Sequence, residues 1–450
     1  MLMLNADENR KIWLKTIEEN KALLNGRVKS DIEKYRKGYC KLHITDSNGI
    51  PIKNKKIKIN QISHDFGFGA NMLMLDEFES ESDNATYRSE FKKYFNLATI
   101  PFYWHCLEPE QGKPRYSKSS PKVYRKPTPE LCMEYCTENN IKAKLHCLVY
   151  DTYIPKWLPI NDMKAMEKLY EERFRQISER FTGRFIELEV INELLCEHFW
   201  NYKSVISSKR DIIEWAFGLA KKYFPNETLL INESNPIIGL AENDYRDAYF
   251  LMLENALKSG VKIDKIGLQH HIFTGVSTKT PEEYETSVKR GSPMVEIDKI
   301  LKGLDIISEL GLPLEITEVT VPTFGNTEED EELQADLLEI LYTVWFSHPA
   351  MNNIVYWNVP DGYAHDNGSG WNENNCRGGL WHHDLTPKRS ALRLKKLIDE
   401  IWHTDEELVT DDGGFAEFRG FYGSYNVCIE NFSKEFMLRK NENPVINLKI

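Results

Sequence analysis

The stretch Phe185-Ile-Glu-Leu-Glu-Val-Ile-Asn-Glu193 has the apolar character of a buried strand and ends in a polar pair, Asn192 and Glu193. A second apolar run, Leu312-Pro-Leu-Glu-Ile-Thr-Glu318, also stops on a carboxylate. If both runs are parallel strands of one closed barrel, their carboxyl ends lie at the same rim. The two glutamates would then face a common pocket.

Around these two stretches, short apolar runs alternate with longer amphipathic segments, a pattern typical of repeated βα units. The expected strands are 66–71, 97–104, 143–146, 188–193, 228–233, 265–271, 314–318 and 354–358. The expected helices between them include 164–180, 209–223, 244–259, 294–310 and 332–346. Eight strands alternating with helices predict an α/β fold, a (β/α)8 TIM barrel over residues 64–402.

The segments that flank the barrel have different patterns. Residues 1–37 combine many charges with periodic Ile, Leu and Trp, which predicts a helical segment. Residues 38–63 alternate polar and apolar side chains around the turn Ser47-Asn-Gly49, which predicts a small β unit. Residues 403–450 alternate in the same way. Because two or three strands alone are only marginally stable, we expect 38–63 and 403–450 to pack together as one accessory β module.

Composition limits the possible partners. The 450 residues are 41% hydrophobic and 28% charged, which is typical of a globular protein, and the net charge of −12 disfavours nucleic acid and anionic membranes. The start, Met1-Leu-Met-Leu-Asn-Ala-Asp-Glu8, lacks the basic region and apolar core of a signal peptide. The eight cysteines are scattered and form no CxxC pair, so we expect reduced thiols and no metal or cofactor. The expected location is cytoplasmic, with secretion as the alternative if a leader has been trimmed from the given sequence. The oligomeric state stays open.

Polar or aromatic residues end at least six of the eight expected strands: His146, Asn192-Glu193, Asn232-Glu233, Gln269-His270-His271, Glu318 and Trp357-Asn358. Barrel enzymes carry their chemistry at the carboxyl ends of the strands, so this clustering predicts an active site at one rim. Each residue could instead cap a following helix or pair locally. That explanation is reasonable for one residue and poor for the whole set.

Glu193 and Glu318 suit glycoside hydrolysis, which uses two carboxyl groups on either side of one glycosidic bond. Other roles are open for both residues, because Glu193 could interact with a helix dipole and Glu318 could pair with a barrel lysine. The adjacent His270 and His271 could suggest a metal site. Neighbouring residues of a strand point to opposite faces, however, so only one of the two histidines can face the pocket.

Residues 66–398 resemble glycoside hydrolase family 10, the retaining endo-β-1,4-xylanases. The resemblance rests on eight segments in the family's order: Phe66-Gly-Phe-Gly-Ala70, His146-Cys-Leu-Val-Tyr150 with Pro155-Lys-Trp157, Val190-Ile-Asn-Glu193, Ile231-Asn-Glu233, Ile266-Gly-Leu-Gln-His-His271, Ile316-Thr-Glu318, Tyr356-Trp-Asn-Val-Pro-Asp361 and Gly379–Lys388. Each segment is a weak signal alone. The eight segments in this order are specific.

The resemblance implies a retaining β-glycoside hydrolase that works by double displacement on an oligosaccharide, polysaccharide or glycoside. Glu193 would be the general acid/base and Glu318 the nucleophile, which we expect to be ionised, with a low pKa helped by a hydrogen bond from His271. The residues expected to bind substrate are His146, Tyr150, Asn192, Gln269, His271, Trp357 and Trp104.

The second expected strand departs from the family pattern. The family has Glu-Asn and then Lys at positions that contact the sugar beyond the cleavage point, whereas this chain has Thr99, Ile100 and Tyr103. The resemblance makes xylan the default substrate. The departure in the second strand makes another β-linked glycan or glycoside the main competitor. A non-catalytic carbohydrate-binding barrel is the alternative from another class, which retention of both glutamates disfavours. Residues 361–375 are expected to lie over the pocket.

Overall fold

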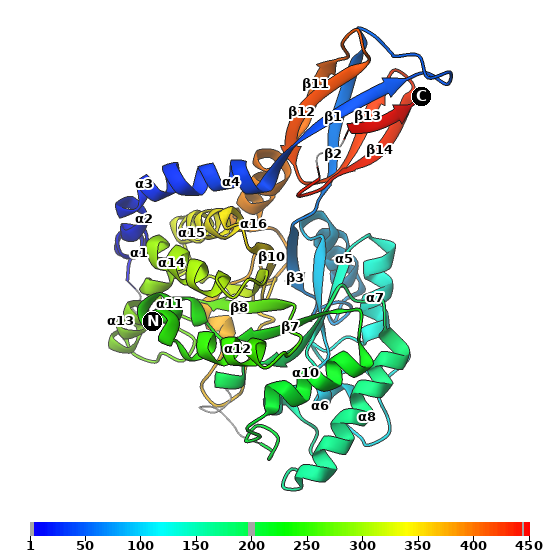
Figure 1. The fold of residues 1–450 in the computed structure, drawn as a ribbon. Coiled ribbons are helices and arrows are strands. Elements are labelled where there is room, and N and C mark those ends of the chain that lie inside the picture. The colour runs from blue at the N-terminus through cyan, green and yellow to red at the C-terminus, as the bar shows by residue number, and fades with distance from the viewer. Residues whose placement is uncertain (1–3, 197–202, 443–444) are drawn as a thin grey trace.

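The computed structural model describes residues 4–196, 203–442 and 445–450, and shows a helix-covered barrel with a smaller β module at one end (Figure 1). The barrel is closed, in the strand order β10-β3-β4-β5-β6-β7-β8-β9. Neighbouring barrel strands are parallel throughout. The expected (β/α)8 TIM barrel with accessory sheets is confirmed.

All eight predicted barrel strands are present: β3 (Gly67–Asn71), β4 (Leu97–Pro101), β5 (Lys142–His146), β6 (Glu187–Asn192), β7 (Thr228–Glu233), β8 (Lys265–His271), β9 (Leu314–Thr320) and β10 (Met351–Tyr356). Nearly every side chain in them is buried, because helices cover one face and the barrel interior the other. The expectation that the second strand reaches residue 104 is wrong. Strand β4 stops at Pro101, which has no backbone N–H to donate, and Trp104 already begins a helix.

Helices surround the barrel. They are α5 (Glu81–Tyr94), α6 (Trp104–Leu107), α7 (Pro129–Glu138), α8 (Met163–Phe181), α10 (Ile212–Tyr223), α11 (Pro236–Asn243), α12 (Ala248–Lys258), α13 (Pro281–Gly291), α14 (Ile297–Ser308), α15 (Glu328–Ser347) and α16 (Arg389–Lys396). Short helical turns occur at Asp151–Tyr153, Asp244–Arg246, Ser292–Val295, Glu373–Cys376 and Leu397–Ile401. The five predicted helices are present, with their ends shifted.

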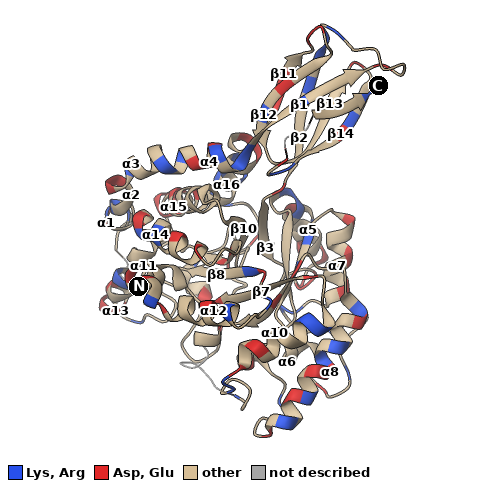
Figure 2. Cartoon of the chain, viewed as in Figure 1, with Lys and Arg blue, Asp and Glu red and all other residues tan. Residues whose placement is uncertain are grey.

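The outer helices are amphipathic, as helix α8 illustrates. Asp162 caps its first turn, accepting a hydrogen bond from the backbone of Ala165, and Met166, Tyr170 and Phe174 face inward at a spacing of one helical turn. Figure 2 shows acidic and basic positions interspersed along this helix. No helix within the described ranges is both long enough and apolar enough to span a membrane.

The N-terminal residues form a run of short helices against the outside of the barrel: α1 (Ala6–Trp13), α2 (Lys15–Glu19), α3 (Lys21–Leu23), a π-helical turn (Leu24–Val28) and α4 (Lys29–Arg36). The indole of Trp13 is fully buried and lies 4.5 Å from the ring of Phe324. Arg36 donates hydrogen bonds to the carbonyl groups of Phe346 and His348 at the end of α15. These contacts fix the segment to the barrel.

The accessory module draws strands from both ends of the chain. Its strands are β1 (Lys37–Thr45), β2 (Lys56–His64), β11 (Asp405–Val409), β12 (Phe415–Phe421), β13 (Gly423–Ile429), β14 (Phe432–Leu438) and β15 (Val445–Lys449). They form two sheets, β12-β1-β15 and β11-β2-β13-β14. Leu42, Ile59 and Tyr425 belong to a core that the sheets share, so the N- and C-terminal strands stabilise one module together.

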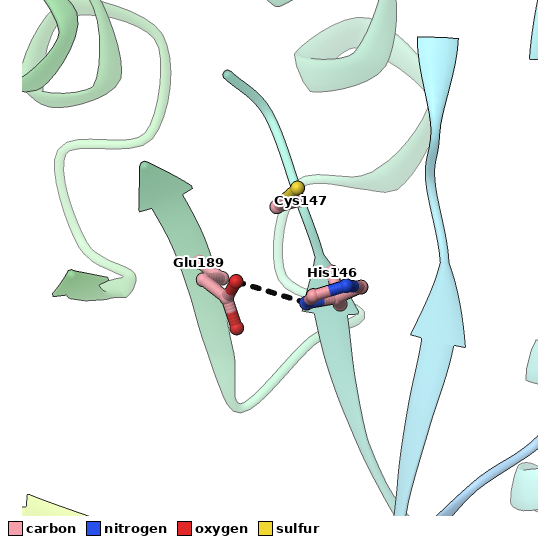
Figure 3. Close-up of side chains that lie close together, drawn as sticks. All are labelled: His146, Cys147 and Glu189. Atoms are coloured by element: carbon pink, nitrogen blue, oxygen red, sulfur yellow. Dashed lines mark hydrogen bonds and ion pairs between the residues drawn. The ribbon is translucent and has the colours of Figure 1, made fainter. Parts of the chain in front are cut away.

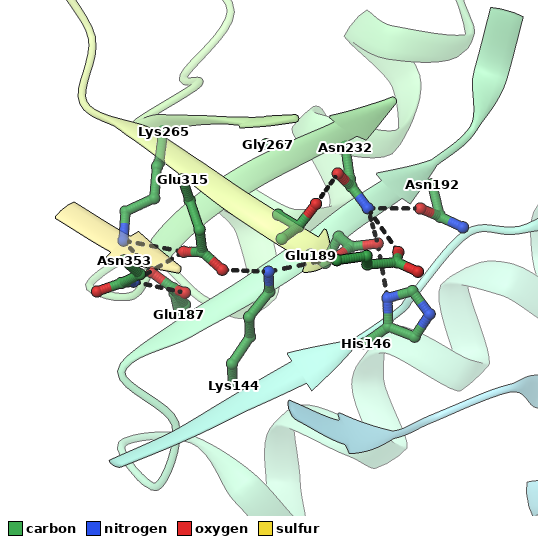
Figure 4. Close-up of polar contacts among 12 residues, drawn as sticks. Lys144, His146, Glu187, Glu189, Asn192, Asn232, Lys265, Gly267, Glu315 and Asn353 are labelled. Atoms are coloured by element: carbon green, nitrogen blue, oxygen red, sulfur yellow. Dashed lines mark hydrogen bonds and ion pairs between the residues drawn. The ribbon is translucent and has the colours of Figure 1, made fainter. Parts of the chain in front are cut away.

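The interior of the barrel contains a buried ion network (Figure 4). Lys144 on β5 is fully buried, and its Nζ lies 2.6 Å from Glu315 Oε1 and 3.5 Å from Glu189 Oε2. TIM barrels usually fill this space with branched aliphatic side chains. A charged group here is stable only if its partners replace the water that it loses. Although burial opposes it, the negative charges of Glu315 and Glu189 raise the pKa of Lys144.

A second cation, Lys265 on β8, extends this network toward the start of the strands. Its ammonium group pairs with Glu187 and, at 3.4 Å, with Glu315, while Asn353 donates to Glu315 at 2.8 Å. Burial and the negative charge of Glu315 raise the pKa of Glu187 to about 7. Burial also acts to raise the pKa of Glu315, but Lys144 and Lys265 hold it far below its ordinary value. The network therefore keeps Glu315 ionised and makes Glu187 the more easily protonated of the two carboxyl groups.

Replacing Lys144 tests how much the fold depends on this network. Lys144→Met would leave Glu315 and Glu189 buried without their shared cation, which should lower the free energy of unfolding by about 3–5 kcal/mol. Chemical denaturation followed by circular dichroism measures the loss. Lys142→Met is the matched control, because Lys142 lies on the same strand with an exposed side chain. Equal effects of the two substitutions would contradict the prediction.

Candidate active site

A cavity of about 710 Å³ opens at the carboxyl ends of the barrel strands. Eight of the nine predicted site residues line it: His146, Tyr150, Asn192, Glu193, Gln269, His271, Glu318 and Trp357. Residues from the predicted covering segment 361–375 line it too, among them His365, Trp371 and Glu373, so the expected position of that segment is confirmed.

A second cavity, of about 570 Å³, lies at the opposite end of the barrel, next to the accessory module. Its lining includes Asp65, Lys142 and Thr228, which lie just before or at the start of β3, β5 and β7. Barrel enzymes place their chemistry at the carboxyl ends of the strands. The first cavity is therefore the candidate active site.

Gln269 connects the two candidate catalytic carboxylates. Its side-chain nitrogen Nε2 lies 2.8 Å from Glu193 Oε1 and 2.9 Å from Glu318 Oε1. Two oxygens that bind one nitrogen can be no further apart than the sum of those distances. This upper limit on the spacing of the two oxygens is compatible with the ~5–5.5 Å between the carboxyl groups of retaining glycosidases.

Glu318, on β9, is almost completely buried and accepts three hydrogen bonds. Gln269 and Asn232 donate to Oε1 at 2.9 and 3.1 Å, and His271 Nε2 lies 3.1 Å from Oε2. The other ring nitrogen of His271 lies 2.9 Å from Thr320 Oγ1. Burial lowers the pKa of His271 to about 4, so the ring is neutral and can donate to Glu318 while it accepts from Thr320.

The expected low pKa of Glu318 is wrong. Burial raises the pKa of this carboxyl well above its ordinary value, and the nearby negative charges of Glu193 and Glu189 act in the same direction. A positive charge on His146 opposes them. The strand pattern predicted His271 as the hydrogen-bond partner, but it did not predict the depth of burial, which decides the direction of the pKa shift.

The backbone turns sharply at Glu193, directly after β6. Glu193 has φ 54°, in the left-handed region that residues other than glycine seldom adopt, and its N–H donates to the carbonyl of Asn232 at 2.9 Å. The Tyr150 hydroxyl donates to Glu193 Oε2 at 2.6 Å, and Gln269 donates to the other oxygen. Both oxygens of the Glu193 carboxyl are therefore held in place.

His146 links the cavity to the barrel interior. Its Nδ1 lies 2.9 Å from Glu189 Oε1 and its Nε2 lies 3.0 Å from the hydroxyl of Tyr103. Figure 3 shows His146 and Glu189 facing each other, with Cys147 next along the chain, and these three residues bring metal-ligating atoms within 4.8 Å of one another. The ammonium group of Lys144, 3.5 Å from Glu189, would repel a metal ion there. A hydrogen-bonded imidazole fits the geometry better.

His270 and His271 point in different directions, as expected for neighbours on a strand. His270 Nε2 lies 2.9 Å from the carbonyl of Met294, outside the cavity, and its ring packs against Trp345. Only His271 lines the cavity. The two histidines therefore cannot bind the same metal ion.

Trp104 is the one predicted site residue that does not line the cavity. Its Nε1 donates to Glu108 Oε2 at 2.9 Å, and its ring packs edge-on against Tyr170, 4.7 Å away. Only 4% of the residue is exposed. The structure thus gives Trp104 a place in the packing between α6 and α8, where it does not reach a substrate.

The three second-strand positions that depart from the family pattern do not all reach the cavity. Thr99 and Ile100 are buried within β4 and do not line the cavity, whereas Tyr103 does. Because β4 ends at Pro101, only the residues after it reach the rim. Of the three positions, only Tyr103 can therefore contact a molecule in the cavity, and the predicted loss of polar sugar contacts at Thr99 and Ile100 stays a prediction.

Several residues at the cavity were not predicted as site residues. Asn232 donates to both Glu318 and Asn192, and its place at the end of a predicted strand was the signal for it. Phe273 stacks on His271, with ring centres 4.5 Å apart. Arg125 and Lys126 line the cavity from the segment between α6 and α7, which has no periodic pattern.

The family comparison identifies the barrel. Residues 62–394 match the model of the family described as Glycosyl hydrolase family 10. The chain belongs to glycosyl hydrolase family 10. Its identity to the relatives described below is low, so the family 10 assignment establishes the family and the fold.

Two curated relatives illustrate that distance. The chain is 28% identical over 407 residues to "Anti-sigma-I factor RsgI6" of Acetivibrio thermocellus, covering 88% of this chain and 45% of that protein. It is 24% identical over 397 residues to "Endo-1,4-beta-xylanase 2" of Arabidopsis thaliana, covering 86% of this chain and 32% of that protein. The chain thus spans about a third to a half of the length of these relatives.

Solved structures of family 10 xylanases share the barrel. Xylanase 10B from Thermotoga petrophila RKU-1, in complex with xylobiose, has a TM-score of 0.57 and 21% identity, covering 75% of this chain and 95% of that chain. Xylanase 10B from Thermotoga maritima, in its native form, has a TM-score of 0.57 and 22% identity, with 75% and 96% covered. At these identities the likeness supports the fold.

The raised pKa of Glu318 predicts the acid side of the pH profile. A nucleophilic carboxylate must be ionised, so kcat/KM falls as the pH drops through its pKa. The midpoint of that fall should lie above the ~4.3 of an ordinary glutamate. His146→Gln should move it further up, because a positive charge on His146 lowers this pKa. Initial rates on an aryl β-glycoside from pH 4 to 9 measure the midpoint for the unmodified protein and for His146→Gln. A midpoint at the pKa of an ordinary glutamate, or one that does not move in His146→Gln, contradicts the prediction.

The hydrogen bond from Tyr150 to Glu193 can be removed without changing the shape of the site. Tyr150→Phe should lower kcat/KM by about tenfold to a hundredfold, since a buried polar group that loses its hydrogen-bond partner costs about 1–3 kcal/mol. The loss should be larger for alkyl than for dinitrophenyl glycosides, whose leaving groups need little protonation. Tyr153→Phe is the matched control, because this cavity tyrosine makes no side-chain hydrogen bond in the described ranges. Equal losses in both variants would refute the role.

Proposed function

We propose that this family 10 member is a retaining β-glycoside hydrolase of the endo-1,4-β-xylanase type, with Glu193 as general acid/base and Glu318 as nucleophile. The observation that carries the proposal is the Gln269 side chain, which hydrogen-bonds both carboxylates through one nitrogen. A short spacing supports direct attack of one carboxylate on the anomeric carbon, as in retaining enzymes.

The reaction follows from the two positions. An oxygen of Glu318 attacks the anomeric carbon while the glycosidic C–O bond breaks and Glu193 gives its proton to the leaving oxygen. The product of this step is a glycosyl ester on Glu318. In the second step, Glu193 removes a proton from water, the water oxygen bonds to the anomeric carbon, and Glu318 leaves as a carboxylate.

Asn192 is placed to hold a sugar hydroxyl beside the reacting carbon. Its Oδ1 accepts a hydrogen bond from Asn232 at 2.8 Å, and this contact orients the amide. In Figure 4 the nitrogen of Asn192 points away from Asn232. Because Asn192 lines the cavity, that nitrogen can donate to the 2-hydroxyl of the sugar, a contact that strengthens in the transition state.

Xylan is the default substrate of the proposal. Relatives of the chain are named endo-1,4-beta-xylanases, and the structure of Thermotoga petrophila xylanase 10B contains xylobiose. A different β-linked glycan is the competitor within the same mechanism, because Tyr103 stands where the family has a polar residue. A relative named an anti-sigma-I factor makes a non-catalytic, carbohydrate-binding barrel the second candidate. The shared hydrogen bonds of Glu193 and Glu318 favour catalysis.

Replacing each glutamate separates the two roles. Glu318→Ala should lower turnover on the order of 10⁴-fold or more on every substrate, and azide should restore cleavage of an aryl β-glycoside as the α-glycosyl azide. Glu193→Ala should spare the first step for dinitrophenyl glycosides and give the β-glycosyl azide. Proton NMR distinguishes the two products.

The matched control is Glu233→Gln, which changes a buried carboxyl on the neighbouring strand. Its partners include the backbone N–H groups of Leu195, Ser234 and Cys196. It should keep hydrolysis that is independent of azide. The assignment is refuted if Glu193→Ala affects activated and unactivated substrates equally. The retaining mechanism is refuted if the unmodified protein releases an α-configured sugar.

A further inference from the structure

Arg125 brings a buried positive charge to the cavity with most of its donors unused. Only 8% of the residue is exposed, and its Nη2 donates to Asn358 Oδ1 at 2.9 Å. The Nε is buried and has no acceptor in the described part of the chain. A guanidinium group has five N–H donors in a rigid planar fork, so a single hydrogen bond leaves the group far from satisfied.

Lys126 places a second positive charge beside it. Its Nζ lies 4.6 Å from the ring centre of Tyr103, and no carboxylate in the described ranges is close enough to form an ion pair with it. Burial and the charge of Arg125 lower the pKa of Lys126 to about 8, which still leaves the amine mainly protonated at neutral pH. In Lys144, by contrast, carboxylate partners raise the pKa.

Two acidic residues lie near the cation pair without neutralising it. Glu373 accepts a hydrogen bond from Asn358 at 2.6 Å, and neither cation forms an ion pair with it in the structure as described. Burial raises the pKa of Glu77 to about 7, so this carboxyl is only partly charged at neutral pH. The charge of Glu373 acts on both cations from a distance, but neither cation has a directly paired carboxylate among the residues that the structure describes. Buried charges normally need such a partner.

A purely structural explanation accounts for part of this arrangement. Arg125 holds Asn358, which has φ 60°, and Lys126 contributes a cation–π contact with Tyr103. These roles use one guanidinium donor and the face of one ring. These structural roles do not explain why two neighbouring residues both bring a positive charge to the cavity wall.

We propose that Arg125 and Lys126 form a carboxylate-binding subsite, and that the substrate is a β-linked glycan bearing a uronic acid near the cleaved bond. The proposal rests on the glycosidase function proposed above and names its substrate class. The guanidinium fork matches the two oxygens of a carboxylate, and the ammonium group adds a second charge. Tyr103, which contacts both Lys126 and His146, places this subsite next to the catalytic rim.

The test compares two substrates that differ only in charge. One is a xylo-oligosaccharide with a glucuronic acid side group, and the other is the same compound with the carboxyl reduced to an alcohol. The unmodified protein should cleave the acidic compound with a kcat/KM at least about tenfold higher, as expected for a charge-assisted bidentate contact. Equal rates, or preference for the reduced compound, overturn the proposal.

Variants locate the preference. Lys126→Gln and Arg125→Gln should each bring the ratio of the two kcat/KM values toward one, and Arg125→Lys should give an intermediate ratio because it keeps the charge without the fork. Lys279→Gln is the matched control, since it removes a positive charge from an exposed side chain of the same cavity and should keep the original ratio. Equal losses on both substrates in Arg125→Gln and Lys126→Gln would assign the pair a structural role and overturn the subsite.

A binding measurement separates this inference from the proposed function. Titration calorimetry of Glu318→Gln with both oligosaccharides should give tighter binding of the acidic one. If this variant prefers the acidic compound while the unmodified protein cleaves neither, the proposed function fails and the subsite stands. If the unmodified protein cleaves both compounds equally and Glu318→Gln binds both equally, the subsite fails and the function stands.

Discussion

The ammonium group of Lys144, buried between Glu315 and Glu189, is the interaction on which the barrel interior depends. On one side, Glu315 continues through Lys265 to the start of the strands. On the other side, Glu189 continues through His146 to the rim. Charges exert strong forces on one another where water is absent, so each of these groups is stable only while its partners stay in place. The network makes the barrel core a fixed arrangement of charges.

The candidate site takes its geometry from this core. Because Glu189 holds Nδ1 of His146, the other ring nitrogen faces Tyr103 in the cavity wall. Glu189 also lies 3.4 Å from Asn232, which in turn donates to Glu318. The side chains around the candidate nucleophile are therefore positioned by residues that no substrate touches. Glu189 raises the pKa of Glu318 and Lys144 lowers it, so the core also tunes the charge of the site.

Sequence patterns identified the strands and the rim because both have a local signature, an apolar run that ends in a polar group. Glu193 and Glu318 were found in this way, and the structure brings them to one cavity. The location of Trp104 could not be found, because the stop at Pro101 and the packing behind α6 are decided by tertiary contacts. The pKa of Glu318 depends on burial, which a strand pattern does not reveal. Arg125 lies in a segment without periodicity, so nothing in the pattern links it to the rim.

The carboxylates around Glu318 and the cations Arg125 and Lys126 act in opposite directions on the pKa of Glu318. Burial and two neighbouring carboxylates already raise the pKa of Glu318. An acidic substrate would bring a further negative charge into the same low-dielectric space and would favour the protonated, unreactive form of the nucleophile. Cations at Arg125 and Lys126 oppose that effect, because they neutralise the substrate carboxylate where it binds. A cavity with these cations can hold an acidic glycan with little further rise in the pKa of Glu318, whereas the same cavity without them would raise that pKa each time the acidic glycan bound.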